Sequence, residues 1–219
     1  MRITSLEYAS LLSYTPRGSS EELQSARAVM LAIKTDDLVE QPPIPMSQWI
    51  ARAVKQNLGS LPFASFFQSN TVLVPVPRSS LMRPGTLWVP DRIAAALVAG
   101  GIGKEVLRCL TRLTPIRKAA LSNASERPTP AEQFETIGVQ GRISDPPPDE
   151  LLLVDDIVTR GATLLGAANR LAEAFPDARI RAFAAMRTVS NPADFVDAYQ
   201  PCTGTIQYRE MTGDSLRRP

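Results

Sequence analysis

The sequence contains no histidine among its 219 residues. This absence excludes Ser-His-Asp triads, Cys-His nucleophile pairs and histidine-ligated metal sites as they are usually built. Any chemistry that the protein performs must therefore use carboxylates, hydroxyls, Arg and Lys side chains, and backbone groups.

Cysteines and long apolar runs are also scarce. Cys109 and Cys202 are too few for a zinc ribbon or a disulfide framework, and they suit a reducing compartment. The apolar stretch near the N-terminus is interrupted by Glu7, and no later segment approaches the length of a membrane span. We therefore expect a soluble, cytoplasmic protein that has no membrane partner.

The charge balance gives a net charge of only +2, which does not by itself indicate a nucleic-acid partner. Local clustering of basic residues keeps that alternative open. Few aromatic residues interleave with the basic ones, so stacking on single strands is poorly supported. The clustered residues are Arg108, Arg112, Arg117, Lys118, Arg217 and Arg218.

The pattern of apolar residues changes along the chain. In residues 1–69 the spacing predicts helices over 6–12, 21–34 and 47–58, with proline-rich breaks between them. Beyond residue 70, strand-like runs at 71–77, 105–110, 151–154 and 179–186, and a possible short one at 134–140, alternate with helical segments at 91–101 and 161–175. This alternation predicts an α/β fold whose central, mainly parallel sheet is flanked by helices. We expect a helical N-terminal region (1–69), a core (70–189) and a C-terminal extension (190–219).

The most informative stretch is LLLVDDIVTRGATLL, residues 151–165. Ligands of open parallel sheets bind beyond the carboxyl ends of the strands, and Asp155 and Asp156 come directly after a buried strand. The turn that follows offers successive N–H groups at a helix start, a glycine for close approach and two hydroxyls, which together suit a phosphate. We call this turn the phosphate cradle; it comprises Thr159, Arg160, Gly161, Ala162 and Thr163.

Carboxylates beside a phosphate cradle predict a sugar-phosphate ligand. Asp155 and Asp156 would accept hydrogen bonds from ribose hydroxyls and hold a divalent cation. The alternative is that the pair caps a helix, but one Asp would suffice for that.

These residues resemble the signature of the type I phosphoribosyltransferases, in which four apolar residues, two acids and a Thr-containing glycine turn follow one another. VLVPVPRSS is similar to the family's pyrophosphate loop and places Arg78 and Ser79 there. VPVPR, the segment 83–97 and the succession of Arg112, Arg127 and Phe134 resemble the ComF-type members associated with competence. The resemblance covers about residues 70–187.

The resemblance implies a phosphoribosyltransferase-like fold that binds phosphoribosyl pyrophosphate and Mg²⁺ at Asp155 and Asp156. It implies transfer of the phosphoribosyl group to a nitrogen nucleophile with release of pyrophosphate. Candidate cations for the leaving group are Arg78, Arg112, Lys118 and Arg127. For Arg78 the alternative is an ordinary surface arginine, and for the others a solvated charged loop. Family members are commonly dimers, so a homodimer is expected.

Two departures from the family pattern affect the expected function. The N-terminal zinc ribbon of many ComF-type chains is missing, and Thr159 stands where purine-salvage members carry an Asp base. The acceptor is therefore unidentified, and a non-catalytic sensor of phosphoribosyl pyrophosphate or a nucleotide remains an alternative. Residues 1–69 or 190–219 would form the hood over the acceptor pocket.

Overall fold

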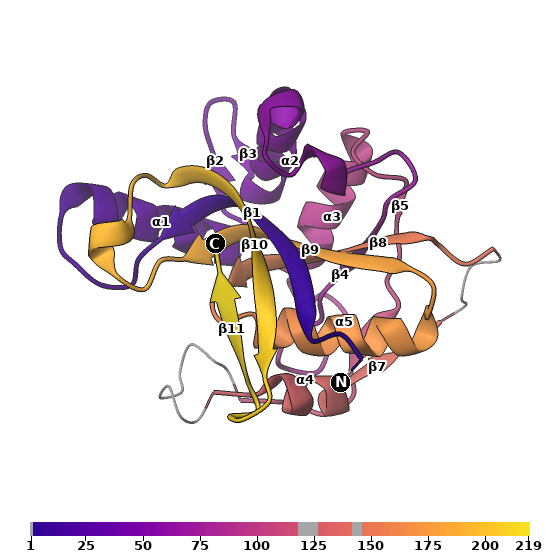
Figure 1. The fold of residues 1–219 in the computed structure, drawn as a ribbon. Helices are drawn as coiled ribbons and strands as arrows, with labels where there is room; N and C mark the ends of the chain where they lie inside the picture. The colour runs from indigo at the N-terminus through magenta and orange to yellow at the C-terminus, as the bar shows by residue number, and fades with distance from the viewer. Residues whose placement is uncertain (1, 118–126, 142–145) are drawn as a thin grey trace.

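The computed structural model describes residues 2–117, 127–141 and 146–219, and its centre is a seven-stranded sheet (Figure 1). The strands β1, β9, β8, β4 and β5 run parallel, and β10 and β11 extend one edge in antiparallel fashion. This sheet confirms the predicted α/β class. In spatial order the strands are β11 (Asp214–Arg218), β10 (Tyr199–Arg209), β1 (Ser5–Tyr14), β9 (Arg179–Thr188), β8 (Glu150–Val158), β4 (Val72–Pro75) and β5 (Glu105–Val106).

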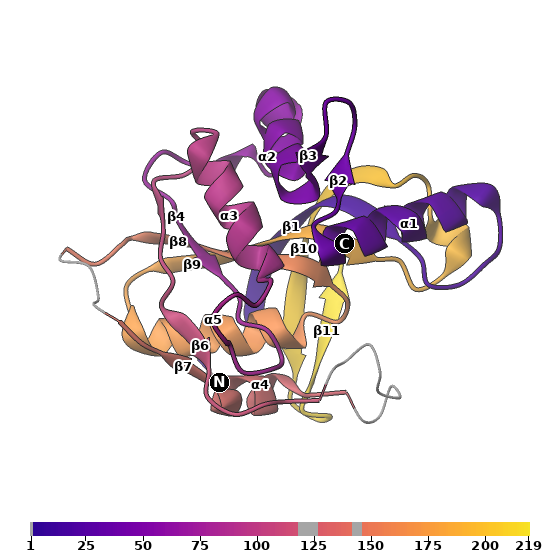
Figure 2. The same cartoon turned by 180° about the vertical axis from the view of Figure 1, so that it is seen from behind.

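Helices cover both faces of the sheet, as the views from the front and from behind show (Figures 1 and 2). One face packs against α1 (Glu21–Thr35), α2 (Met46–Asn57) and α3 (Val89–Ala99). The other packs against α5 (Ala162–Ala174), which in turn contacts α4 (Pro130–Thr136). Two small antiparallel ladders, β2 (Leu38–Val39) with β3 (Ile44–Pro45) and β6 (Leu110–Arg112) with β7 (Ile137–Val139), lie outside the main sheet. Short 3₁₀ turns are η1 (Leu58–Ser60), η2 (Ala64–Phe66) and η4 (Pro192–Asp194).

Alternating side chains of the central strands supply both cores. In β8, Leu151 and Leu153 belong to the core under α5, whereas Leu152 and Val154 belong to the core under α1 to α3. All four are buried, which is why the strand reads as a continuous apolar run. On β9, Phe183 contributes to an aromatic cluster in the core under α1 to α3.

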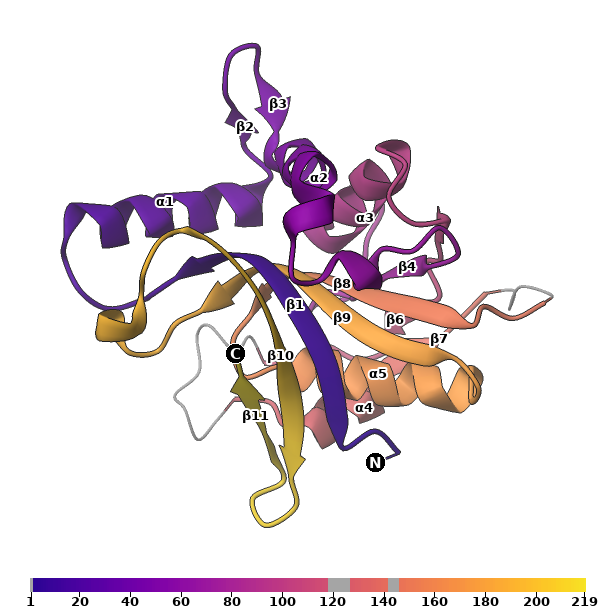
Figure 3. The same ribbon diagram turned by 45° about the horizontal axis from the view of Figure 1, so that its top comes forward.

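The predicted helix over residues 6–12 is wrong, because this segment is strand β1 in the middle of the sheet (Figure 3). Leu6 and Tyr8 face the α5 core, and Leu11 and Leu12 face the other. A strand buried on both faces is apolar at nearly every position, so its periodicity does not separate it from a buried helix.

The predicted strand over 105–110 is also wrong as a single element. The chain forms β5 at the sheet edge, then leaves it and begins β6 of another ladder at Leu110. The possible strand at 134–140 begins inside α4, and only Ile137–Val139 is extended. The other predicted helices are confirmed as α1, α2, α3 and α5.

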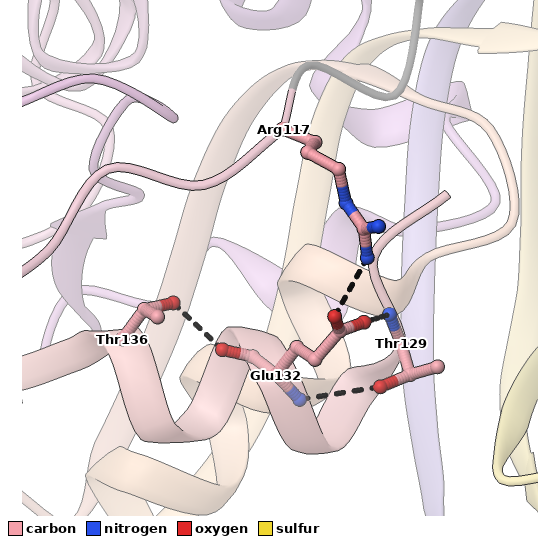
Figure 4. Close-up of polar contacts among 4 residues, drawn as sticks. All are labelled: Arg117, Thr129, Glu132 and Thr136. Carbon is pink, nitrogen blue, oxygen red and sulfur yellow. Dashed lines mark hydrogen bonds and ion pairs between the residues drawn. The ribbon is translucent and has the colours of Figure 1, made fainter. Parts of the chain in front are cut away.

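Helix α4 begins with a complete capping box (Figure 4). The Glu132 N–H donates to the Thr129 hydroxyl over 3.2 Å, and the Thr129 N–H donates to the Glu132 carboxylate over 2.8 Å. Arg117 donates to the same carboxylate over 2.7 Å, and the Thr136 hydroxyl donates to the Glu132 carbonyl oxygen over 2.7 Å. Arg117 is thereby fixed to the first turn of α4.

The sheet draws strands from all three predicted regions of the chain. The N-terminal region supplies β1, the predicted core supplies β4, β5, β8 and β9, and the C-terminal extension supplies β10 and β11. Within the described ranges, no helix is both long and apolar enough to cross a membrane.

Candidate functional site

A small cavity lies where β8 ends and α5 begins. Its volume is about 40 Å³, whereas one water requires roughly 10–15 Å³, so it accommodates a few waters or a single phosphate group. It brings together the whole predicted phosphate cradle, Asp155 and Arg127. The lining residues are Arg127, Pro128, Gln133, Asp155, Ile157, Val158, Thr159, Arg160, Gly161, Ala162, Thr163 and Leu164.

The phosphate cradle is the N-terminal end of a 13-residue helix. The first intrahelical hydrogen bond runs from the Leu165 N–H to the Gly161 carbonyl oxygen over 2.9 Å. The N–H groups of Ala162, Thr163 and Leu164 therefore have no intrahelical acceptor, and glycine at the cap position supplies no side-chain one. Together with the helix dipole, these N–H groups favour an anion in the cavity.

Gly161 has a structural role besides the predicted close approach of a ligand. Its φ is +85°, which disfavours residues with a side chain. A Cβ at this position would also lie 2.6 Å from the Cδ1 atom of Ile206 on β10. The glycine is therefore required for the turn to pack against the sheet, and its predicted role in the close approach of a ligand stays a prediction.

Asp155 lies in the cavity wall, whereas Asp156 is absent from the lining formed by the described residues. The Asp155 carboxylate accepts the Asp156 N–H over 2.9 Å, and the Asp156 carboxylate accepts the Ile157 N–H over 2.7 Å. Burial and the neighbouring Asp156 charge raise the pKa of Asp155 well above its usual range, and the more distant Arg112 charge opposes them only in part. A cation or a set of hydroxyl donors would relieve this cost.

The predicted Mg²⁺ would take Asp155 and Asp156 as its protein ligands. In the described part of the chain, no three His, Cys, Asp or Glu side chains converge as metal ligands. Mg²⁺ in proteins usually keeps several waters and takes one or two carboxylates together with substrate phosphates. Of the two predicted ligands, only Asp155 lines this cavity, and a cation shared by Asp155 and Asp156 stays a prediction.

Arg112 lies in strand β6, so the alternative that it belongs to a solvated charged loop is wrong. It is 3% exposed, and its guanidinium donates to the Arg78 carbonyl oxygen (2.8 Å), the Thr136 hydroxyl (2.6 Å) and the Gln133 amide oxygen (3.0 Å). Burial lowers the pKa of Arg112 to about 10, although the Asp155 charge opposes the shift. Arg112 thus holds the segment after β4 and the cavity-lining Gln133 in place. It supports the site without lining the cavity.

The segment that follows β4 is anchored by its own polar groups. Arg78 donates to the Leu87 carbonyl oxygen over 2.6 Å, and the Ser79 carbonyl oxygen accepts the Ile116 N–H over 2.9 Å. Neither Arg78 nor Ser79 lines the small cavity. Their contact with pyrophosphate therefore stays a prediction.

The remaining predicted cations differ in their placement. Arg127 lines the cavity, and its buried Nε has no hydrogen-bond partner among the described residues. Arg160 lines the cavity too, but its guanidinium pairs with Asp214 of β11. Lys118 lies outside the described residues.

Sequence reasoning missed the supports of the phosphate cradle that come from the C-terminal hairpin of β10 and β11. Arg217 donates to the Thr159 carbonyl oxygen over 2.6 Å, Asp214 pairs with Arg160, and Ile206 packs against Gly161. The two arginines near the C-terminus read in sequence only as a basic tail. The strand-like run at 204–210, which overlaps β10, was the available signal that this tail joins the sheet.

Neither a family model nor a curated protein sequence matches the chain. Among solved structures, it is similar to a hypoxanthine phosphoribosyltransferase from Staphylococcus aureus, with 11% identity over 76% of this chain and 78% of that one and a TM-score of 0.32. It is also similar to a hypoxanthine phosphoribosyl transferase from Trypanosoma cruzi, with 12% identity over 89% and 88% and a TM-score of 0.31. Because identity and TM-score are both low, neither likeness assigns an activity to this chain.

Proposed function

We propose that the protein binds phosphoribosyl pyrophosphate with Mg²⁺ and transfers the phosphoribosyl group to a nitrogen nucleophile, releasing pyrophosphate. One observation carries this proposal: a single phosphate-sized cavity joins the free N–H groups of a helix start to the Asp155 carboxylate at a strand end. The resemblance of residues 151–165 to the type I phosphoribosyltransferase signature agrees with it.

In this proposal the 5-phosphate occupies the phosphate cradle. The N–H groups of Ala162, Thr163 and Leu164 donate to its oxygens, and the hydroxyls of Thr159 and Thr163 add further donors. The ribose would then extend past Asp155, beyond the carboxyl ends of the strands.

The main electrostatic task is to stabilise the charge that develops on the departing pyrophosphate. Mg²⁺ held at Asp155 and Asp156 would neutralise part of that charge. Arg127 is the best-placed described side chain to assist, because it lines the cavity. Arg112 contributes indirectly by fixing the backbone at Arg78.

Thr159 in place of a base lowers the expected rate without excluding transfer. A positioned general base contributes roughly 100- to 10,000-fold. Orienting the two reactants contributes about 7 to 11 kcal/mol, which is the larger effect. We therefore expect slow transfer to a nucleophile that needs little help with deprotonation.

Thr159 is also the observation that favours a second candidate, a non-catalytic sensor that binds phosphoribosyl pyrophosphate and regulates a partner.

The nucleic-acid alternative is weakened by the structure, because several of the clustered basic residues are already engaged in contacts within the protein. Arg108 pairs with Asp91, Arg117 pairs with Glu132, Arg112 is buried, and Arg217 is bonded to backbone.

A pyrophosphate-release assay separates these readings. Purified protein is incubated with phosphoribosyl pyrophosphate, Mg²⁺ and a panel of nitrogen bases, and binding of phosphoribosyl pyrophosphate is measured calorimetrically in parallel. An enzyme gives binding and base-dependent release, and a sensor gives binding alone. Absence of binding at millimolar concentration contradicts both, and a salt-dependent gel shift would then favour the nucleic-acid alternative.

A further inference from the structure

The C-terminal hairpin holds three consecutive residues of the phosphate cradle, each through a different hairpin residue. Arg217 bonds to the carbonyl oxygen of Thr159, Asp214 pairs with Arg160, and Ile206 packs against Gly161. The hairpin residues are distant from the cradle in sequence: Asp214 is 54 positions from Arg160, and Arg217 is 58 positions from Thr159. This contact is therefore a tertiary brace on the turn.

Arg217 is the centre of this brace. Its Nε donates to the Thr159 carbonyl oxygen over 2.6 Å, its Nη1 donates to the Tyr8 hydroxyl over 2.6 Å, and its Nη2 donates to the Thr188 carbonyl oxygen. One planar guanidinium thus ties the cradle to β1 and to the end of β9. Its rigid fork of donors suits three acceptors in fixed directions, which a lysine ammonium on a flexible stem does not.

The bond to Thr159 has a direct consequence for the cradle. The Thr159 carbonyl and the Arg160 N–H belong to one trans peptide plane, so they point in opposite directions. Holding the oxygen on Arg217 therefore fixes the Arg160 N–H to point away from the hairpin. The direction of the first N–H group of the turn is set from outside the turn.

We propose that Arg217 is a positioning residue for the phosphate cradle, which orients the Thr159–Arg160 peptide for an anion and has no contact with that anion itself. This inference rests on the proposed function in taking a sugar phosphate as the ligand. The bracing of the peptide plane can be tested without any ligand.

A variant of Tyr8 tests whether Arg217 only stabilises the sheet or also positions the cradle. The Tyr8 side chain is fully buried in the α5 core, and Tyr8→Phe removes one bond of Arg217 without touching the cradle. If Arg217 only stabilised the sheet, Tyr8→Phe and Arg217→Met would have similar effects on anion binding. Arg218→Met is the second control, because Arg218 is the exposed neighbour on the same strand.

The experiment measures the affinity for inorganic phosphate and for phosphoribosyl pyrophosphate with Mg²⁺, and the amide ¹⁵N and ¹H shifts of Arg160 and Gly161 without ligand. Because small misplacements at a preorganised site are costly, Arg217→Met is expected to weaken binding about tenfold or more. It is also expected to move the Arg160 amide shift. Tyr8→Phe is expected to stay within about twofold in affinity, and Arg218→Met to match the parent.

Unchanged affinity and an unchanged Arg160 shift in Arg217→Met would overturn the proposal, as would an equal loss in Tyr8→Phe. If Arg217→Met does not fold, Arg217→Lys replaces it, and the same shift of the Arg160 amide is expected because an ammonium does not reproduce the fork. If the parent binds no phosphoribosyl pyrophosphate, the proposed function fails, and the Arg160 shift still decides the positioning role.

Discussion

At the scale of single residues, Asp155 links the site to pH-dependent stability. Its pKa is raised in the folded protein by burial and by Asp156, so ionising it costs folding free energy. Below the unfolded-state pKa of about 3.9, both states are protonated and the cost vanishes, and it grows as pH rises towards the folded pKa. Asp155→Asn should therefore be more stable than the parent at pH 8, with a difference that shrinks towards pH 4.

Urea unfolding of parent and Asp155→Asn across this pH range measures that difference, and Asp37→Asn, at an exposed acid, is the control. A stability difference that does not vary with pH would contradict the raised pKa. The same variant should lose its affinity for phosphoribosyl pyrophosphate, because the ligand's hydroxyls and cation no longer meet a carboxylate.

Gly161 allows a second residue-scale prediction that separates backbone strain from packing. Gly161→Ala places a side chain at positive φ, which costs about 1 to 3 kcal/mol, and forces it against Ile206, which adds roughly 1 to 3 kcal/mol. Gly101→Ala is the matched control, because Gly101 has a φ of +82° and nothing within 4 Å of the added Cβ. Chemical denaturation should show the larger loss at Gly161, and an equal loss at both positions would exclude the packing role.

At the scale of elements, Arg112 joins β6 to α4 and to the segment after β4. Arg112→Met leaves three acceptors without their donor, and each buried unpaired group costs about 1 to 3 kcal/mol, although relaxation will recover part of it. We expect a loss of about 2 to 4 kcal/mol in unfolding free energy. Arg117→Met, which breaks an exposed pair with Glu132, should cost less than about 1 kcal/mol. Similar losses in the two variants would show that Arg112 is not a brace.

The elements also show which parts of the fold are readable from sequence. Helix α1 has a Ser20 cap and ends where Asp36 adopts a left-handed conformation, so local chemistry marks both of its ends. Strand β1 carries no such mark, because it pairs along its two edges with β9 and β10, which are distant in sequence. Only the tertiary pairing makes residues 5–14 a strand.

At the scale of the whole molecule, the site also contains some parts that local sequence predicts and others that only tertiary contacts form. The phosphate cradle and Asp155 lie close together in sequence and line one cavity, although Asp156 of the predicted pair does not. The hydrogen bond between Arg217 and Tyr8 joins residues 209 positions apart, and no local sequence pattern predicts such a contact. The sequence therefore predicts the groups that would meet a ligand better than the groups that hold them in place.

The whole molecule also yields a prediction about metal dependence. The described residues offer the cation two neighbouring carboxylates and no third ligand, so Mg²⁺ should bind only together with a phosphorylated ligand. At 100 times its dissociation constant, phosphoribosyl pyrophosphate with Mg²⁺ should stabilise the fold by about 2.7 kcal/mol, which raises Tm by roughly 5 to 10 °C in a domain of this size. Mg²⁺ alone should leave Tm unchanged, and EDTA should remove most of the ligand's effect. A thermal shift of equal size with Mg²⁺ alone would instead indicate a resident metal site and contradict this account of the carboxylate pair.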